Sequence, residues 1–403
     1  MKNTDIALST AEILLPKQGL SLEKWAVVAC DQFTAEPSYW AEAEMTAKGV
    51  PSALWITLPE IYLNERSARV PGIHASMREY LGSALAAEVP EGFVLVERGT
   101  SAGLRQGLLA CVDLEKYDFS KGSESLIRAT EGTVPERVPP RAEIRSEAPL
   151  ECPHVMMLID DPECSVIEPA LSDPGRLLYD FDLMLGGGHI RGWALEDGRA
   201  RRVFDAVARL AERAGGLLFA VGDGNHSLAA AKQCWASLRE TLSSAELESH
   251  PARWALVELV NLHCPALVFE PIHRALFNAD PEAVLAEWRA SGAFRDGGED
   301  VRIAFGDRVL GFSCDGHPIR PLQDFLDGFL KRRPEAEIDY IHGDESLLSL
   351  ACRENTVGFM PRAFDKAELF PYIRKYGVLP RKTFSMGHAR DKRYYLEARR
   401  IVS

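Results

Sequence analysis

The residues with the clearest chemical potential are 222–227, "GDGNHS", which combine a carboxylate, an amide, an imidazole and a hydroxyl with two glycines. The carboxylate of Asp223 suits a divalent cation, and the imidazole of His226 suits a proton transfer or a hydrogen bond to a phosphoryl oxygen. Glycines at 222 and 224 let a ligand approach the backbone closely. This set of residue types is typical of a site for an anion such as phosphate.

The flanking residues predict a strand that turns into a helix at this motif. Residues 217–221 are a short apolar run, and apolar residues at helical spacing follow from Leu228 to Leu238. The first amides of a helix have no intrahelical acceptor, and the helix dipole adds positive charge there, which favours an anion. The alternative is that Asp223 and Asn225 only cap the helix while the glycines only form the turn. The local pattern leaves both interpretations open.

Two further candidates are acids that follow predicted strands or loops. Asp31 ends the apolar run "WAVVAC", where a carboxylate can act as a general base or metal ligand, or can simply cap the following turn. Its neighbour Cys30 is interpreted as a packed thiol, because no base is committed to it. Arg128 and Glu131 lie in residues 120–150, where they form either part of a substrate lid or a solvated ion pair.

Cationic candidates gather near the C-terminus of the sequence. Residues 381–400 carry seven Lys or Arg side chains against Asp391 and Glu397, which predicts either a phosphate-binding pole or an ordinary exposed basic face. The seven are Arg381, Lys382, Arg390, Lys392, Arg393, Arg399 and Arg400.

The overall composition narrows the class of protein. The 403 residues are 46% hydrophobic and carry a net charge of −13, so a large core is expected and general binding to nucleic acid or anionic membranes is not. No apolar run long enough for a signal peptide or a membrane span occurs, which predicts a cytoplasmic protein. Eight scattered cysteines predict reduced thiols. Walker, Rossmann, HExxH and GxSxG motifs are absent from the sequence.

Helical and strand patterns alternate along the chain, which predicts an α+β or mixed α/β fold. Residues 120–150 contain four prolines and many charges, and they predict a long surface excursion. A boundary is expected near 275–282. It would separate a core of residues 1–278 from an α/β portion of residues 279–403 that contributes basic residues to the site.

Five blocks in order along almost the whole chain carry a resemblance to a known family. They are "WAVVACDQFTAEPSYW", "SLIRATEGT", "GDGNHSLAAAK", "EPIHRAL" and "PRKTF", and the sequence resembles the bacterial and archaeal family called domain of unknown function 1015 (DUF1015). The "DGNH" turn is similar to a motif of ParB-like domains, a superfamily that includes sulfiredoxin and a free-serine kinase. The resemblance implies a ParB-like core whose turn holds nucleotide phosphates. It also places Ser227 where many such motifs have an arginine, so Arg274, Arg381 and Lys382 are expected to supply the cation.

Together these observations predict a phosphotransferase that binds ATP or ADP with Mg²⁺ and acts on a small hydroxylated metabolite such as free serine. Asp223 would hold the metal, Asp31 would orient or deprotonate the acceptor hydroxyl, and Arg128 and Glu131 would belong to a lid. The expected phosphate and nucleotide ligands are Gly222, Gly224, Asn225, His226, Ser227, His273, Arg274, Arg381, Lys382 and Thr383. Homo-oligomers are left open. The alternatives are a nucleotide-sensing regulator or DNA-associated protein, and a phosphatase or nuclease that uses the same carboxylates.

Overall fold

The computed structural model describes residues 1–402, which form two compact units. Unit 1 comprises Met1–Leu267 and the segment that begins at Gly387, and unit 2 comprises Val268–Met386. The boundary expected near 275–282 therefore falls inside unit 2. The reason is that the strand 269–277 is continuous and pairs with strands of unit 2 along its whole length. The mixed α/β fold class is confirmed.

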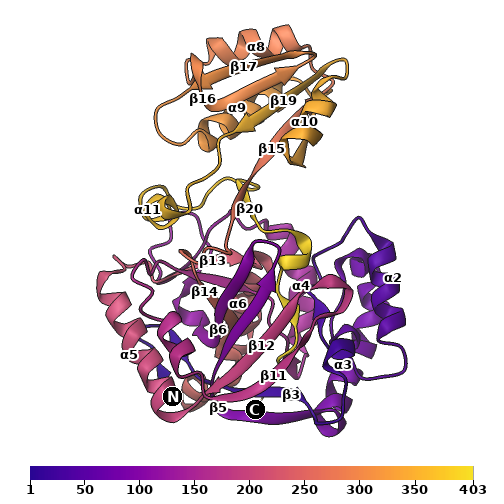
Figure 1. The fold of residues 1–403 in the computed structure, drawn as a ribbon, viewed down its shortest axis with the longest axis vertical. Helices are drawn as coiled ribbons and strands as arrows, with labels where there is room; N and C mark the ends of the chain where they lie inside the picture. The colour runs from indigo at the N-terminus through magenta and orange to yellow at the C-terminus, as the bar shows by residue number, and fades with distance from the viewer. Residues whose placement is uncertain (403) are drawn as a thin grey trace. The chain divides into compact units, whose positions relative to one another are not determined.

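A large mixed sheet forms the centre of unit 1 (Figure 1). Most neighbouring strands are antiparallel, but β14–β10, β13–β8 and β8–β7 are parallel. Its main path runs β11 (Arg176–Asp182), β12 (His189–Leu195), β5 (Leu85–Thr100), β6 (Gly103–Asp113), β14 (Trp254–Asn261), β10 (Met156–Ile159), β13 (Phe219–Asp223), β8 (Ile127–Ala129) and β7 (Tyr117–Asp118). Three N-terminal strands join it: β1 (Lys2–Asn3), β2 (Leu8–Ser9) and β3 (Ala11–Pro16).

The two faces of this sheet bury separate hydrophobic cores, because side chains alternate along each strand. In β5, Phe93 and Leu95 face one core while Val94 and Val96 face the other. The first core is covered by α5 (Asp197–Arg213) and α6 (Asn225–Arg239), and the second by α2 (Pro37–Thr46) and α3 (Arg66–Ser83). The shorter helices of unit 1 are α1 (Leu22–Trp25), α4 (Val138–Ser146) and α7 (Ser244–Ser249).

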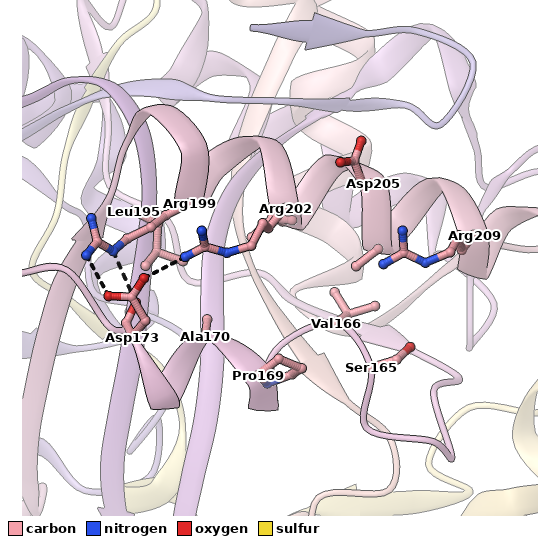
Figure 2. A pocket seen from close by; sticks show the side chains of 12 residues that line it. Ser165, Val166, Pro169, Ala170, Asp173, Leu195, Arg199, Arg202, Asp205 and Arg209 are labelled. Atoms are coloured by element: carbon pink, nitrogen blue, oxygen red, sulfur yellow. Dashed lines mark hydrogen bonds and ion pairs between the residues drawn. The ribbon is translucent and has the colours of Figure 1, made fainter.

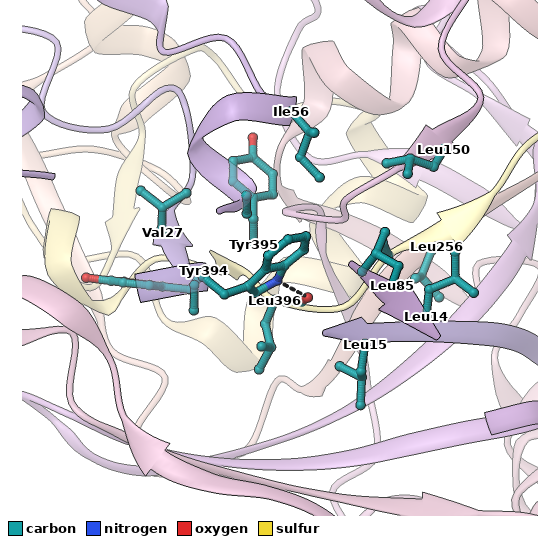
Figure 3. Packing of buried hydrophobic residues seen from close by; sticks show 14 of the residues in the cluster. Leu14, Leu15, Val27, Ile56, Leu85, Leu150, Leu256, Tyr394, Tyr395 and Leu396 are labelled. Atoms are coloured by element: carbon teal, nitrogen blue, oxygen red, sulfur yellow. Dashed lines mark hydrogen bonds between the residues drawn. The ribbon is translucent and has the colours of Figure 1, made fainter. Parts of the chain in front are cut away.

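The C-terminal segment of unit 1 is built into the second core. Two short strand pairs anchor it, β21 (Tyr394–Tyr395) on β4 (Val27–Val28) and β22 (Arg399–Arg400) on β9 (Leu150–Glu151). Figure 3 shows Leu396 among the leucines of this core, where its carbonyl accepts a hydrogen bond of 2.8 Å from the Trp25 indole. The basic residues of 390–400 therefore belong to a structured segment and do not form a free tail.

Unit 2 has a sheet of its own. Its strands follow the order β17 (Arg308–Ser313), β16 (Arg295–Phe305), β19 (Thr356–Pro361), β15 (Phe269–Phe277) and β18 (Glu337–His342), and β20 (Phe384–Met386) pairs with the start of β15. Helices α8 (Pro281–Ala290) and α9 (Ile319–Arg332) cover one face, and α10 (Asp344–Ala351) covers the other. Helix α11 (Leu369–Tyr376) precedes β20.

The expected surface excursion at 120–150 is more ordered than its composition indicates. Strand β8 is part of the main sheet, and α4 packs on α6 through Val138, Ala229 and Ala230. Arg128 lies within β8 and is 8% exposed, and its guanidinium donates to the carbonyls of Ser125 and Gly216. The placement of Arg128 on a lid is therefore corrected. Its side chain fixes backbone inside the sheet.

Candidate functional site

The predicted strand-to-helix turn is confirmed at residues 222–227. Strand β13 ends at Asp223, α6 begins at Asn225, and Gly224 between them is the N-cap in the left-handed conformation, with φ of 81°. A Cβ at Gly224 would lie 3.1 Å from the Cα of Val155, so both the conformation and the space require glycine. The side chains of Asp223 and Asn225 do not cap the helix. The N-cap residue is Gly224, and no side chain makes a capping hydrogen bond there. The first amide that bonds back to the turn is that of Ser227, 3.0 Å from the Gly224 carbonyl oxygen.

Sheet topology brings other polar residues to the same edge. Strands β8 and β13 are parallel with Ala129 opposite Val221, so Glu131 follows β8 where Asp223 ends β13. Strand β10 is antiparallel to β13, so His154, just before β10, reaches this edge from the opposite direction. The turn at 222–227 is thus the centre of a polar cluster.

The cation of this cluster is Lys392. Its Nζ lies 3.3 Å from Oδ2 of Asp223, and the two side chains are 12% and 24% exposed. Two arginines of the main sheet fix the backbone around Lys392. Arg98 donates to the Lys392 carbonyl, and Arg105 donates to the Asp391 carbonyl. The pairing of β4 with β21 continues as a bond of 2.8 Å from the Ala29 amide to the Arg393 carbonyl. Lys392 therefore lies beside the chain that leads into Cys30 and Asp31.

Ser227 has a fixed partner. Its Oγ lies 2.9 Å from Nε2 of His154, and Nδ1 of the same ring lies 2.8 Å from the Tyr395 hydroxyl. That hydroxyl accepts from the Cys30 amide, at 3.2 Å. Burial raises the pKa of Tyr395 well above its ordinary value, so the phenol keeps its proton.

The His154 ring joins Ser227 to Tyr395 through its two nitrogens. The nitrogen that carries the ring proton decides the direction of both hydrogen bonds. In either direction, Ser227 Oγ is a polar atom at the start of α6 and Ser227 lines the cavity beside the turn.

His226 is a neutral group. Its Nε2 accepts from the Val134 amide at 3.2 Å, which places the ring proton on Nδ1. Burial, with further contributions from Arg137 and Arg141, lowers the pKa of His226 to about 4. Both arginines form ion pairs with one carboxylate oxygen of Glu60, at 2.7 and 2.9 Å. His226 can donate one hydrogen bond from Nδ1, but it is not a cation at neutral pH.

A cavity of about 160 Å³ adjoins the turn. Polar side chains from the cluster line one part of it, including Ser227, His154, Tyr395 and Cys30. Burial, followed by the charge of Asp31, raises the pKa of Cys30 to about 12, so it is a protonated thiol, as the sequence indicates. Most other lining residues are apolar: Ile56, Leu58, Leu63, Met77, Ile144, Ala148, Leu150, Val155, Leu228, Ala230, Ala231 and Ala255.

Asp31 lies next to this lining in the turn after β4. It is half-buried, and its Oδ1 accepts a bond of 3.0 Å from the Gln32 amide group. The neighbouring residue Cys30 reaches the cavity itself. This position keeps Asp31 among the candidates, and its role stays a prediction.

The predicted ligands from the second half of the chain lie in unit 2. His273 is 1% exposed and its Nε2 lies 2.8 Å from Asp344, while Thr383 bonds to the carbonyl of Pro380 at 2.6 Å. Arg274 is fully buried inside unit 2, where its guanidinium lies 5.3 Å from the ring centre of Tyr340. These contacts stabilise unit 2 and give no support to phosphate binding. Arg381 and Lys382 are exposed residues of unit 2, and their role stays a prediction.

Among residues 1–402, no group of three or more His, Cys, Asp or Glu side chains is placed to hold a metal ion. Asp223, the predicted ligand, already interacts with Lys392 and accepts from the Gly224 amide at 3.1 Å. Mg²⁺ often binds through only one or two carboxylates and substrate phosphates, so a metal carried by a nucleotide stays a prediction.

Most of the residues that surround Ser227 and His226 could not be identified from the sequence. His154 and Tyr395 sit in segments with no recognisable motif, and Arg137 and Arg141 lie in the stretch interpreted as a surface excursion. Lys392 was visible as one of seven basic residues, but nothing in the composition distinguished it from the others. Strand pairing brings these residues together, and the spacing of residues along the sequence does not show which strands pair.

A second hollow lies on the surface of unit 1, between α5 and the residues before β11 (Figure 2). Arg199 and Arg202 face it from α5, and both bond to the carboxylate of Asp173, at 2.5 and 2.7 Å. The arginines are 41% and 62% exposed. Exposed ion pairs of this kind contribute little to stability, and here the acid already neutralises part of the positive charge.

Comparison with known proteins places the chain in a family. Residues 14–399 match the model described as "Protein of unknown function (DUF1015)", so the chain belongs to this family. A search of curated proteins finds no match.

Among solved structures, a free serine kinase mutant in complex with ADP is 10% identical, with a TM-score of 0.40, and the alignment covers 72% of this chain and 91% of that one. A conserved hypothetical protein from Pyrococcus furiosus is 11% identical, with a TM-score of 0.36 and coverage of 72% and 90%. SbnI from Staphylococcus aureus, with a C-terminal truncation, is 11% identical, with a TM-score of 0.37 and coverage of 69% and 82%. Likeness at this level assigns no activity to the chain.

None of the helices in residues 1–402 is long and apolar enough to cross a membrane.

Proposed function

We propose that this protein is a nucleotide-binding phosphotransferase that acts on a small hydroxylated metabolite at the turn 222–227. The observation that carries the proposal is the meeting of a helix N-terminus, the half-buried Lys392 and the Ser227 hydroxyl at one turn beside a cavity. Each of these groups can interact favourably with negative charge, which supports an anion site at this turn.

The phosphate groups would bind against the first turn of α6. The amides of Asn225 and His226 precede the first amide that bonds back to the turn, so they are positioned as donors. Ser227 adds a hydroxyl group at the same place.

Lys392 takes the role that an arginine at 227 would have. Its ammonium, already beside Asp223, would neutralise charge that develops on the transferred group, and phosphoryl transfer depends mainly on such positioning and electrostatics. Asp223 would keep the ammonium oriented. Asp31, which follows the chain paired with the Lys392 segment, would orient the acceptor hydroxyl.

The test is to incubate the purified full chain with Mg-ATP, Mg-ADP or pyrophosphate and a panel of hydroxylated metabolites. We expect a donor to raise the melting temperature, because ligand at 100 times its Kd stabilises a folded protein by about 2.7 kcal/mol. We also expect phosphate transfer that requires an acceptor. No donor-dependent shift and no transfer would refute the proposal.

The same experiment separates the alternatives. Phosphate release without an acceptor would indicate a phosphatase or nuclease. Nucleotide binding without any turnover, combined with salt-sensitive binding to duplex DNA, would indicate a DNA-associated regulator.

A further inference from the structure

The cavity next to the turn has a largely apolar lining. Twelve of its lining residues are aliphatic or methionine, contributed by the segments 56–63 and 148–155, by α3, α4 and α6, and by β14. An apolar cavity of about 150 Å³ is known to hold a benzene-sized molecule. The cavity here, at about 160 Å³, offers the same room.

One charged side chain in the lining has an unused donor. Arg145 pairs through Nη1 with Glu151 at 2.5 Å, but its Nη2 is buried without a hydrogen-bond partner among the described residues. A buried guanidinium nitrogen without an acceptor is costly, and a ligand carboxylate would satisfy it. Glu151 does not lose its own pairing in the process, because Arg399 also lies 2.9 Å from it.

A second polar group in the lining is the Ser227 hydroxyl, next to the turn. The cavity therefore offers an apolar body, this hydroxyl, and the Arg145 guanidinium, while Arg141 and Glu60, which pair with each other, complete the charged part of the lining with Glu151. A ligand that uses all three parts has an apolar ring or branched chain, a carboxylate and a hydroxyl.

We infer that the cavity binds the acceptor as an apolar hydroxy acid, with the ring or branched chain among the aliphatic residues, the carboxylate at Arg145 and the hydroxyl near Ser227. This inference rests on the proposed function for the identity of the reacting group, but the binding itself needs no nucleotide. Free serine lacks the apolar body that the cavity is built to bury.

The test compares two probes that share one head group, lactate and 3-phenyllactate, by titration calorimetry on the full chain without nucleotide. We expect 3-phenyllactate to bind roughly 10- to 150-fold more tightly, which is the gain for burying a phenyl side chain. Ile144→Trp should fill the cavity and abolish that gain. Ser146→Trp, on the exposed side of the same helix, is the matched control and should retain it.

A third variant tests the carboxylate contact. Arg145→Lys keeps the charge beside Glu151 but loses the second donor, so we expect it to weaken 3-phenyllactate and lactate by the same factor. It should leave the binding of 3-phenylpropanol, which has no carboxylate, unchanged.

The outcomes separate the two proposals. Equal binding of lactate and 3-phenyllactate, binding of neither, or an unchanged ring preference in Ile144→Trp would overturn the inference, even if nucleotide binds. A ring preference in a protein that binds no phosphate donor would uphold the inference and refute the phosphotransferase.

Discussion

Replacement of Lys392 by Met tests the central electrostatic claim, because it removes the ammonium and keeps much of the apolar stem. Its Nζ lies 3.3 Å from Asp223, and with an effective dielectric constant of about 20 the attraction between two unit charges at that distance is roughly 5 kcal/mol. Desolvation and side-chain ordering offset most of this, so the folded protein should lose only about 1 kcal/mol. Phosphate binding should lose more, since a hydrogen bond to a charged group contributes about 1.5–3 kcal/mol.

We therefore expect Lys392→Met to raise the Kd for the bound phosphate donor by roughly 10- to 150-fold while the urea midpoint changes little. The measurement is titration calorimetry with ATP, ADP and pyrophosphate at low and high salt, because screening should reduce the difference. Lys48→Met, at an exposed lysine of unit 1, is the matched control and should bind like the native protein.

The double variant Lys392→Met/Asp223→Asn distinguishes binding from folding. Removing both charges leaves no uncompensated carboxylate, so the stability should recover, whereas affinity for phosphate should not. A Lys392→Met protein that binds the donor with native affinity would refute the assignment of Lys392. Recovery of affinity in the double variant would show that the lysine serves only to neutralise Asp223.

Three further predictions address other parts of the site. Because the pKa of His226 is lowered to about 4 from an ordinary 6.5, the neutral ring stabilises the fold fully above pH 6.5, and we expect that contribution, about 1–2 kcal/mol after allowance for partial exposure, to be lost as the pH falls towards 4. Urea titrations of the native protein and His226→Gln across this range check it, and parallel pH profiles would contradict it. Tyr395→Phe leaves the Cys30 amide without its acceptor and should cost about 1–3 kcal/mol of unfolding free energy in urea, and an unchanged midpoint would disprove the hydrogen-bond chain. Gly224→Ala should cost at least about 1–2 kcal/mol and weaken phosphate binding, because the left-handed backbone and the nearby Val155 exclude a Cβ; a native melting temperature would contradict this.

The local geometry of the turn could be predicted from the sequence because its causes are local. A run of five apolar residues, a glycine that tolerates the left-handed conformation and an apolar helical repeat define β13, Gly224 and α6 within about twenty residues. The inferred preference for an anion follows from the helix start itself. Alternating helical and strand patterns also correctly predicted the mixed class of the fold.

The partners of the turn could not be predicted, because sheet pairing decides them. Ser227 meets His154 only because β10 is antiparallel to β13, and that register is not encoded in the spacing of either residue. Lys392 reaches Asp223 only because Arg98 and Arg105 bind the carbonyls around it. Charge composition indicated a basic segment, but exposure and ion pairing, which select one lysine from it, depend on long-range contacts.

The prediction of a surface excursion at residues 120–150 failed for a different reason. Prolines and charges usually indicate exposed loops, yet prolines at the start of a helix are compatible with its geometry. Here Pro139 and Pro140 lie in the first turn of α4, and Pro135 begins the short helix before it. Composition averaged over the stretch hid the three-residue strand β8, which is too short to show an alternating pattern.

The pairing of β15 with β20 has a consequence for the entropy of the chain. Unit 2 interrupts unit 1 between Leu267 and Gly387. If these residues were a flexible loop of about 120 residues, bringing the segment with Lys392 back to unit 1 would cost roughly 4 kcal/mol in loop-closure entropy. The pairing of Phe269 with Met386, supported by the stacked rings of Phe269 and Phe384, brings the two ends of unit 2 together. Folding of unit 2 thus shortens the effective loop that unit 1 must close. Mutations that unfold unit 2 should therefore weaken the anchoring of Lys392 without touching any residue of the site.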